Sequence, residues 1–251
     1  MKTIIRTRDL VKSFITESGT QTIINHLDLD IYEKDFTVIM GSSGAGKSTL
    51  MYSLSGMDRP TSGSILFGGE EITKMSNDKL AVFRRKYCGF VFQQVYLLDR
   101  MSLMDNAMTA GLLVEKNKKV VAGRAKELFE KVNLPEVTYR KRVNQVSGGE
   151  AARAGIVRAA INRPAVVFAD EPTGALNSDN STAVLDVLTE LNRDGQSIIM
   201  VTHDRKSALR GSRIIYLKDG KIYGELSLGS FQQDKEERGD KLDQFLKEMG
   251  W

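Results

Sequence analysis

The sequence predicts an α/β fold in which a largely parallel β-sheet is flanked by helices. Short apolar runs alternate with helix-compatible stretches along most of the chain, as in successive β–α units. Residues 165–168 and 197–201 are β-rich and apolar throughout, which is typical of strands buried on both faces. Residues 97–144 contain no convincing strand and have helical periodicity, which indicates a helical lobe inserted into the sheet fold.

The predicted elements follow in a regular order along the chain. The early strands are residues 3–8, 27–32 and 36–40, followed by a helix at 47–55 and further strands at 64–67 and 89–92. Helical periodicity in the lobe is clearest over 123–132. Residues 214–217 and 221–223 form a late hairpin, because the Asp219-Gly220 pair between them is a strong two-residue turn. The tail from Gln232 is charged and is predicted to be helical near 241–249.

Length and composition narrow the class of protein. A chain of 251 residues suits one large domain, or one domain with an inserted lobe. The net charge of +4 comes from 36 basic and 32 acidic residues spread along the chain, unlike the basic patch of a dedicated DNA-binding protein. No nucleic-acid partner is therefore expected. The single cysteine, Cys88, excludes an intramolecular disulfide, fits a reducing compartment, and is interpreted as a small buried apolar residue.

The sequence contains no apolar segment long enough to predict a membrane span, which needs about 18 residues or more. The first residues lack the apolar run and small-residue cleavage site of a secretory signal. We therefore expect a cytoplasmic protein that would need another subunit to attach it to a membrane.

Residues 41–48, Gly-Ser-Ser-Gly-Ala-Gly-Lys-Ser, match the phosphate-loop pattern G-x-x-x-x-G-K-[ST]. Glycines let the backbone curl so that its N–H groups point at phosphate oxygens, and the following helix offers its positive N-terminus. Lys47 supplies a charge near the β- and γ-phosphates, and Ser48 a hydroxyl ligand for Mg²⁺. The loop follows an apolar run and precedes a helix-compatible stretch, which lowers the odds of a chance match.

Two acidic residues, Asp170 and Glu171, follow the apolar strand at 165–168. The carboxyl end of such a strand lies at the ligand crevice of an open α/β sheet. Since adjacent strand residues point in opposite directions, the two carboxylates can take different roles. Asp170 is predicted to hold Mg²⁺ through water, and Glu171 to orient or deprotonate the attacking water. Alone, the pair would be read as a solvated strand end; with the phosphate loop it indicates an ATPase.

A third motif, Val-Ser-Gly-Gly-Glu at residues 146–150, resembles the ABC signature usually written L-S-G-G-Q. With the phosphate loop, Gln93, the Asp-Glu-Pro-Thr run at 170–173 and His203, it makes the chain resemble an ABC-transporter nucleotide-binding domain over residues 3–226. The resemblance implies a P-loop NTPase fold with a mostly parallel core sheet and a small antiparallel β subdomain. It also implies a nucleotide-binding domain at 1–226, a helical subdomain inserted at about 95–160, and a charged, partly helical extension at 227–251.

The resemblance assigns roles residue by residue. Gln93 resembles the glutamine that reaches Mg²⁺ and water, and His203 the switch histidine that holds the γ-phosphate and the attacking water. Phe14 stands where the family has an aromatic that stacks on adenine; a core phenylalanine is the alternative. The expected catalytic residues are Lys47, Gln93, Glu171 and His203, and the expected Mg²⁺ ligands are Ser48, Gln93 and Asp170. The expected ATP-binding residues are Phe14, Gly41, Ser42, Gly44, Ala45, Gly46, Lys47, Ser48, Thr49, Ser147, Gly148, Gly149 and Glu150.

The signature residues imply a second copy of the chain. Ser147 and the two glycines after it, at the start of a predicted helix over 150–161, would contact the γ-phosphate of ATP bound to the other subunit. The chain is therefore expected to form a head-to-tail dimer that encloses two ATP molecules. Two positions depart from the family pattern: Glu150 replaces Gln, and Asn177 replaces the Asp of the D-loop, which puts coupling between the two ATP sites in doubt. His26 matches no motif and is interpreted as structural or exposed.

Residues 83–85, 89–93, 97–98 and 169–178 resemble those of compact ATPases that serve macrolide-exporter (MacB), lipoprotein-release (LolD) and bacitracin-resistance (Bce-type) permeases. Residues 199–204 and 216–223 lean towards the last of these. This resemblance implies an integral membrane permease as partner, with the ATPase peripheral on the inner face of the membrane. Met101, Met104 and Met108 either line the permease-facing groove or pack within a helix. The rival classes are a non-transport ABC ATPase acting on DNA or ribosomes, and a module that binds nucleotide without turnover. The missing coiled coil, the single nucleotide-binding domain and intact Lys47, Asp170, Glu171 and His203 argue against them.

Overall fold

The computed structural model describes residues 2–17, 19–231 and 236–251 of the chain. The chain forms two compact units: unit 1 consists of Met1–Leu80 with Ser197–Trp251, and unit 2 of Ala81–Gln196. Helix α2 (Asn77–Tyr87) contains the point at which the chain passes from one unit to the other. The domain boundaries proposed above, at 95–160 and 226, stay predictions.

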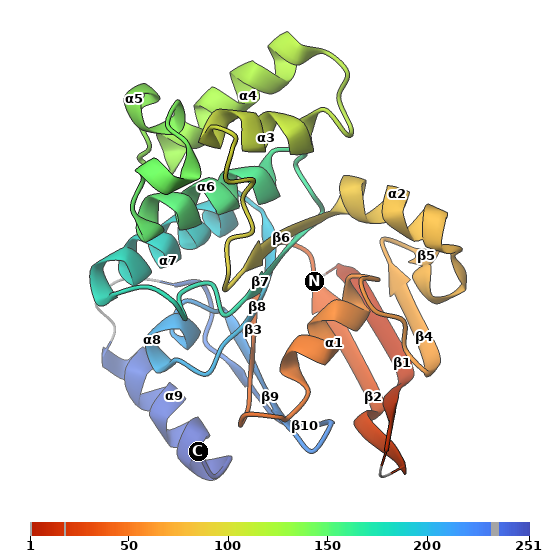
Figure 1. The fold of residues 1–251 in the computed structure, drawn as a ribbon. Helices are drawn as coiled ribbons and strands as arrows, with labels where there is room; N and C mark the ends of the chain where they lie inside the picture. Colours follow the sequence, from red (N-terminus) through yellow and green to blue (C-terminus); the bar gives the residue numbers. More distant parts are fainter. Residues whose placement is uncertain (1, 18, 232–235) are drawn as a thin grey trace. The chain divides into compact units, whose positions relative to one another are not determined.

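Unit 1 contains an antiparallel sheet in the order β2-β1-β4-β5. Its strands are β1 (Thr3–Thr16), β2 (Gly19–Tyr32), β4 (Ser62–Phe67) and β5 (Glu70–Glu71). The first two form a long hairpin, drawn in red in Figure 1. They extend well beyond the strands predicted at 3–8 and 27–32. The register shifts where Asp9 and His26 adopt left-handed φ angles of 51° and 49°, and this irregularity hides the alternation in the sequence.

His26 lies at this irregularity and does not belong to any candidate site. Its Nδ1 lies 2.6 Å from Oδ1 of Asp9, and both side chains are exposed. The interpretation of His26 as a structural or exposed residue is therefore confirmed.

The other strands of unit 1 run in the order β10-β9-β3-β8. They are β3 (Phe36–Met40), β8 (Ser197–Val201), β9 (Arg213–Lys218) and β10 (Lys221–Ser227). Strand β3 is parallel to both β8 and β9, and every residue of β3 and β8 is buried. Strands β9 and β10 form the predicted hairpin, with Asp219 and Gly220 at positive φ as their turn requires.

Unit 2 contains a parallel pair of strands and a group of helices (Figure 1). The strands are β6 (Cys88–Phe92) and β7 (Val166–Asp170). The helices that lie within it are α3 (Leu103–Gly111), α4 (Lys118–Lys131), α5 (Glu136–Tyr139), α6 (Gly148–Ala160) and α7 (Ser178–Arg193). Residues 97–144 contain helices and one isolated bridge but no strand, which confirms the predicted helical character of this stretch. Cys88 is buried as predicted, and its burial raises the pKa of the thiol.

Short helices complete the units. Unit 1 holds α1 (Lys47–Leu54), the turn η1 (Ile72–Lys74) and α8 (Arg205–Ala208), and unit 2 holds the turn η2 (Val143–Gln145). Helix α1 ends one residue before the predicted boundary at 55. Among the described residues, no helix is both long and apolar enough to cross a bilayer.

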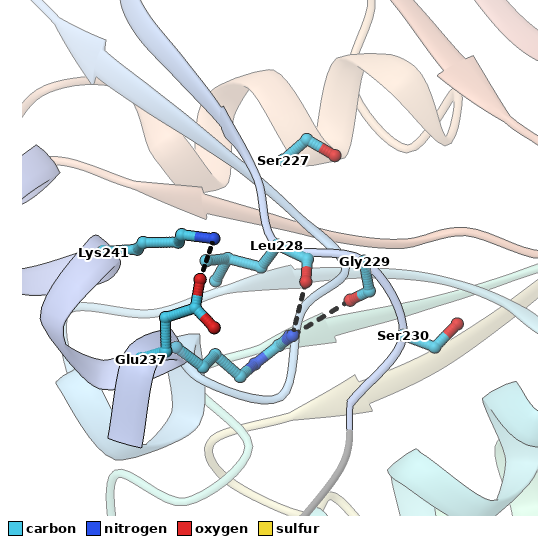
Figure 2. A pocket seen from close by; sticks show the side chains of 7 residues that line it. Ser227, Leu228, Gly229, Ser230, Glu237 and Lys241 are labelled. Atoms are coloured by element: carbon cyan, nitrogen blue, oxygen red, sulfur yellow. Dashed lines mark hydrogen bonds and ion pairs between the residues drawn. The ribbon is translucent and has the colours of Figure 1, made fainter. Parts of the chain in front are cut away.

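The C-terminal helix α9 (Glu236–Glu248) is longer than the predicted stretch at 241–249 and packs within unit 1. The first part of the predicted charged tail, 232–235, lies outside the described residues. Arg238 of α9 is buried, and its guanidinium donates to the carbonyls of Leu209, Gly211, Leu228 and Gly229. Figure 2 shows the last two of these contacts beside a cavity of about 370 Å³. Burial lowers the pKa of Arg238, and the carbonyl oxygens compensate for its lost hydration.

Candidate functional site

The predicted phosphate loop joins β3 to α1 in unit 1 and has a backbone that only glycine accommodates readily. Gly41 adopts φ +151°, and a Cβ there would lie 2.2 Å from the carbonyl oxygen of Leu217. Gly44 and Gly46 have φ angles of +80° and +96°, and Gly46 is the N-cap of α1. The glycines at these three positions therefore allow the curled backbone that the motif requires.

Lys47, at the start of α1, lies against the loop itself. Its Nζ donates to the carbonyls of Gly41 at 2.8 Å and Ser42 at 2.9 Å. The backbone N–H of Ala45 also donates to the Ser42 carbonyl. The loop thus places an ammonium group beside the N-terminus of a helix, and both favour a bound anion.

The switch-histidine candidate lies at the same sheet edge as this loop. Strand β8 runs parallel beside β3, and the N–H of Thr202 donates to the carbonyl of Ile39. Since parallel strands present their carboxyl ends at one edge, the phosphate loop after β3 and His203 after β8 share that edge. The Thr202 hydroxyl oxygen accepts from the N–H of Asp204, and Asp204 caps α8. His203 is therefore an exposed side chain on a firmly held backbone.

Phe14, the candidate adenine-stacking residue, lies near the end of β1. Its side chain is 42% exposed, which excludes the alternative that it is a core phenylalanine. The ammonium of Lys12 lies 4.7 Å from the centroid of its ring. The structure therefore leaves apolar ring surface open to a ligand.

Unit 2 brings Gln93 and the acidic pair together. Strands β6 and β7 are parallel, with Phe92 paired to Asp170, so Gln93 and Glu171 each follow a strand at the same edge. A Cβ on Gly174 would lie 2.9 Å from Nε2 of Gln93, which shows how closely the loop after Glu171 approaches the glutamine. These are three of the four oxygen-bearing side chains that the sequence assigned to Mg²⁺ or the attacking water; the fourth, Ser48, belongs to unit 1.

Glu171 has an unusual backbone conformation. Its φ is 44°, in the left-handed region that non-glycine residues seldom adopt, and its carbonyl accepts from the N–H of Gly174. Such strain costs about 1–3 kcal/mol. Glu171 is one of eight non-glycine residues with positive φ among the described residues. The strained position coincides with the residue predicted to activate water.

The signature motif begins α6 with a capping box. The Ser147 hydroxyl accepts from the N–H of Glu150 at 3.3 Å, and the Glu150 carboxylate accepts from the N–H of Ser147 at 2.7 Å. The hydrogen bond from the Ser147 backbone is the main cause that lowers the pKa of Glu150. Glutamine performs the same capping role, so the Glu150 replacement preserves the local structure.

The loop after Glu171 lies between Gln93 and the signature motif, both in unit 2. Gly174 approaches Gln93, while Leu176 lies against Gly148, where a Cβ would be 3.7 Å from Leu176 Cδ2. Gly149 is closer still to α7, since a Cβ there would lie 2.0 Å from Oδ1 of Asn180. Asn177 caps α7 by accepting from the N–H of Asn180, a role that Asp and Asn fill equally well. The D-loop replacement therefore keeps the helix cap.

The proposed Mg²⁺ ligands fit a hard cation, because a hydroxyl, an amide oxygen and a carboxylate are all oxygen donors. Across the part of the chain that the structure describes, no group of three or more His, Cys, Asp or Glu could hold a metal ion. Magnesium bound mainly through phosphates and waters needs only one or two such protein ligands.

Two residues close to the candidate site were not predicted from the sequence. Lys12 contacts Phe14, and Asn180 packs against Gly149. The signal for Lys12 was available, because residues two apart on a strand share a face. Asn180 had no such signal, because its contact depends on how α6 and α7 pack.

Comparison with known proteins supports the motif analysis. The family model described as ABC transporter matches residues 24–174. The chain is 37% identical over 227 residues to the bacitracin export ATP-binding protein BceA of Halalkalibacterium halodurans, covering 90% of this chain and 89% of that protein. It is 40% identical over 221 residues to the macrolide export ATP-binding/permease protein MacB of Rhodopseudomonas palustris, covering 88% of this chain. It spans only about a third (34%) of that relative.

A solved structure has the same fold. The ATP-binding cassette MJ0796, solved as a dimer in a post-hydrolysis state bound to ADP and Pi, matches with a TM-score of 0.83 and 32% identity. The match covers 90% of this chain and all of that one (100%). The predicted α/β fold of an ABC ATPase is thus confirmed.

Proposed function

Because this chain belongs to the ABC transporter family, we propose that it is the ATP-hydrolysing subunit of an ABC transporter. The observation that carries the proposal is the family match over 24–174, which includes the phosphate loop, Gln93, the signature and the acidic pair.

ATP binding is assigned to Gly41–Thr49 and Phe14. The backbone N–H groups at the start of α1 and the Lys47 ammonium bind the phosphate oxygens, and Ser48 supplies a hydroxyl for Mg²⁺. In binding, Lys47 exchanges the carbonyls of Gly41 and Ser42 for phosphate oxygens, which are stronger acceptors for a cation.

Hydrolysis is assigned to Glu171, Gln93 and His203. Glu171 accepts a proton from the attacking water or orients it, Gln93 donates to or accepts from that water, and His203 contacts the γ-phosphate. Bound Mg²⁺, held by Ser48, Gln93 and Asp170, would neutralise charge on the β- and γ-phosphates.

Dimerisation follows from the signature. Ser147 is exposed and is the N-cap of α6. Among the contacts described, the only anionic group of its own chain at this helix N-terminus is the Glu150 carboxylate. We propose that Ser147 and the N-terminus of α6 bind the γ-phosphate of ATP held by a second copy of the chain. The solved relative MJ0796 is a dimer.

The proposed partner is an integral membrane permease, which would hold the ATPase at the cytoplasmic face of the membrane. After Gln93, the chain exposes Tyr96, Leu98 and Met101, while Met104 and Met108 are half-buried one turn apart on α3. An exposed apolar segment of this kind marks a protein interface. We therefore assign residues 96–101 to the permease contact and, within α3, give Met104 and Met108 a packing role as well.

The substrate branch is proposed from the relatives. Export of an antimicrobial peptide fits the similarity to BceA, and macrolide or lipoprotein export is the alternative, since MacB is similar at 40% identity. Co-purification with a permease of the neighbouring reading frame separates them. A ten-span permease with a large external domain supports peptide resistance, and a four-span permease supports the macrolide or lipoprotein type.

The test of catalysis compares steady-state ATPase rates of the wild type and the Glu171→Gln variant. The variant should lose at least about 100-fold in turnover, the usual contribution of a general base, and should still bind ATP. Equal rates in the two proteins would remove Glu171 from the mechanism. The exposed Glu70→Gln variant is a matched control and should turn over ATP at the wild-type rate.

A further inference from the structure

Lys12 is a buried lysine on β1, two residues before Phe14. Only 9% of its surface is exposed, and lysines are seldom so buried unless their charge is paired. Its Nζ donates to Oδ1 of Asp58 and to the carbonyl of Arg59, both at 2.7 Å. The charge is therefore compensated inside the protein, and Lys12 has a fixed position.

The fixed ammonium of Lys12 lies over the ring of Phe14. Residues two apart on a strand share one face of the sheet, and here Nζ is 4.7 Å from the ring centroid. This is within the roughly 6 Å range of a favourable cation–π interaction. A cation over one face holds the ring in one orientation, while 42% of the side chain remains exposed to a ligand.

The partners of Lys12 connect it to the phosphate loop. Asp58 follows α1, and the N–H groups of Met57 and Asp58 donate to the carbonyl of Tyr52 at the end of that helix. The N-terminus of α1 is the phosphate loop. Lys12 thus ties the strand that carries the ring to the helix that carries the phosphate site, and all these residues belong to unit 1.

We propose that Lys12 is a positioning residue that holds the Phe14 ring as a preformed stacking surface for the base of the bound nucleotide. The inference rests on the proposed ATP site. A side chain that is already ordered loses little conformational freedom when a ligand binds, so its contact contributes more to affinity. Lys12 bonds to residues that follow the C-terminal end of α1, whereas the phosphate loop precedes its N-terminal end, so we expect Lys12 to affect only ligands that carry a base.

The experiment measures the dissociation constants of Mg·ADP and Mg·pyrophosphate for the full chain by calorimetry. Both Phe14→Leu and Lys12→Met should weaken ADP binding about three- to tenfold, with pyrophosphate binding unchanged. The double variant should bind ADP no more weakly than Phe14→Leu, because Lys12 acts through the ring. Lys79→Met, at an exposed lysine of the same unit, is the control and should match the wild type for both ligands.

Three outcomes would overturn the inference, and they are distinguishable from failure of the proposed function. If Lys12→Met weakens both ligands equally, Lys12 is only a structural tie. If the two single losses add in the double variant, the residues act independently. If Lys12→Met binds ADP as the wild type does, the ring needs no support. In contrast, a wild type that binds neither ligand contradicts the phosphate site, and an unaffected Phe14→Leu variant contradicts the assignment of Phe14.

Discussion

Glu150 shows how one side chain can serve a motif while differing from its usual form. Its carboxylate accepts from the N–H of Ser147 and completes the capping box at the start of α6. The same hydrogen bond lowers the pKa of the carboxyl group below its ordinary value of 4.5. A carboxyl whose pKa is lower in the folded state stabilises the fold above its unfolded pKa, and this contribution disappears as pH falls through the folded pKa.

This sign gives a prediction for pH dependence. Between pH 7 and about pH 4.5 the wild type should keep the benefit of the charged cap, and below that it should lose stability relative to Glu150→Gln, which does not titrate. Urea unfolding of both proteins across this range measures the difference. Because Glu150 is only half-buried and solvent screens its charge, the change is expected to be small. A stability advantage of the wild type over Glu150→Gln that grows on acidification would contradict the capping role.

At the residue scale, the sequence proposes which residues form the site but does not give their conformations. The phosphate-loop glycines were predictable because positive φ angles and a close backbone approach require them. The left-handed φ of Glu171 was not, since nothing in an acidic pair after a strand indicates strain. The contact of Lys12 with Phe14 was within reach of strand alternation, but its ties to Asp58 and Arg59 needed the fold.

Among the elements, the packing of α6 against α7 makes the two signature glycines unequal. A Cβ at Gly149 would lie 2.0 Å from Oδ1 and 2.9 Å from Cβ of Asn180, whereas one at Gly148 would make ordinary contact with Leu176. Neither glycine has a positive φ, so alanine fits the backbone at both positions. The difference between them is therefore one of space alone.

Alanine at these two positions tests that difference. Gly149→Ala should destabilise the protein by about 1–3 kcal/mol through overpacking, while Gly148→Ala should stay within about 0.5 kcal/mol of the wild type. Urea unfolding of each variant gives both values. In an Asn180→Gly background the cost of Gly149→Ala should disappear. A similar cost in both backgrounds would place the origin of the effect elsewhere.

The ends of helices and strands were predictable where local sequence determines them, and not where packing does. Strands β3 and β8 match their predicted limits, because every residue in them is buried and each strand coincides with one β-rich run of the sequence. The β1–β2 hairpin was predicted only in part, because register shifts near Asp9 and His26 break the alternation. Helix α9 was underestimated because Arg238 in its first turn is a charged residue that the fold buries.

For the whole molecule, the proposed site residues are divided between the two units. Unit 1 holds the phosphate loop, Phe14 and His203, whereas unit 2 holds Gln93, the acidic pair and the signature. The loop 171–177 links the strained Glu171 to Gln93 through Gly174 and to Gly148 through Leu176. This physical link offers unit 2 a route from the signature to the residue proposed to activate water, and Asn177 preserves the helix cap next to it.

The proposed sandwich predicts that two inactive variants restore each other. Lys47→Ala removes the phosphate-loop charge, and Ser147→Phe adds bulk at an exposed signature position while giving up the hydroxyl that accepts from the N–H of Glu150. Each variant alone should be inactive, because every ATP in a symmetric dimer would meet one defect. In an equal mixture, a heterodimer combines both defects in one site and leaves the other intact, so turnover should recover to about a quarter of the wild-type rate. Steady-state ATPase assays of the mixture measure this recovery.

If each site were built from a single chain, both variants would stay defective and the mixture would show only the sum of the separate rates. That outcome would contradict the shared site, whereas recovery requires that the loop at Gly41–Thr49 be completed by another copy.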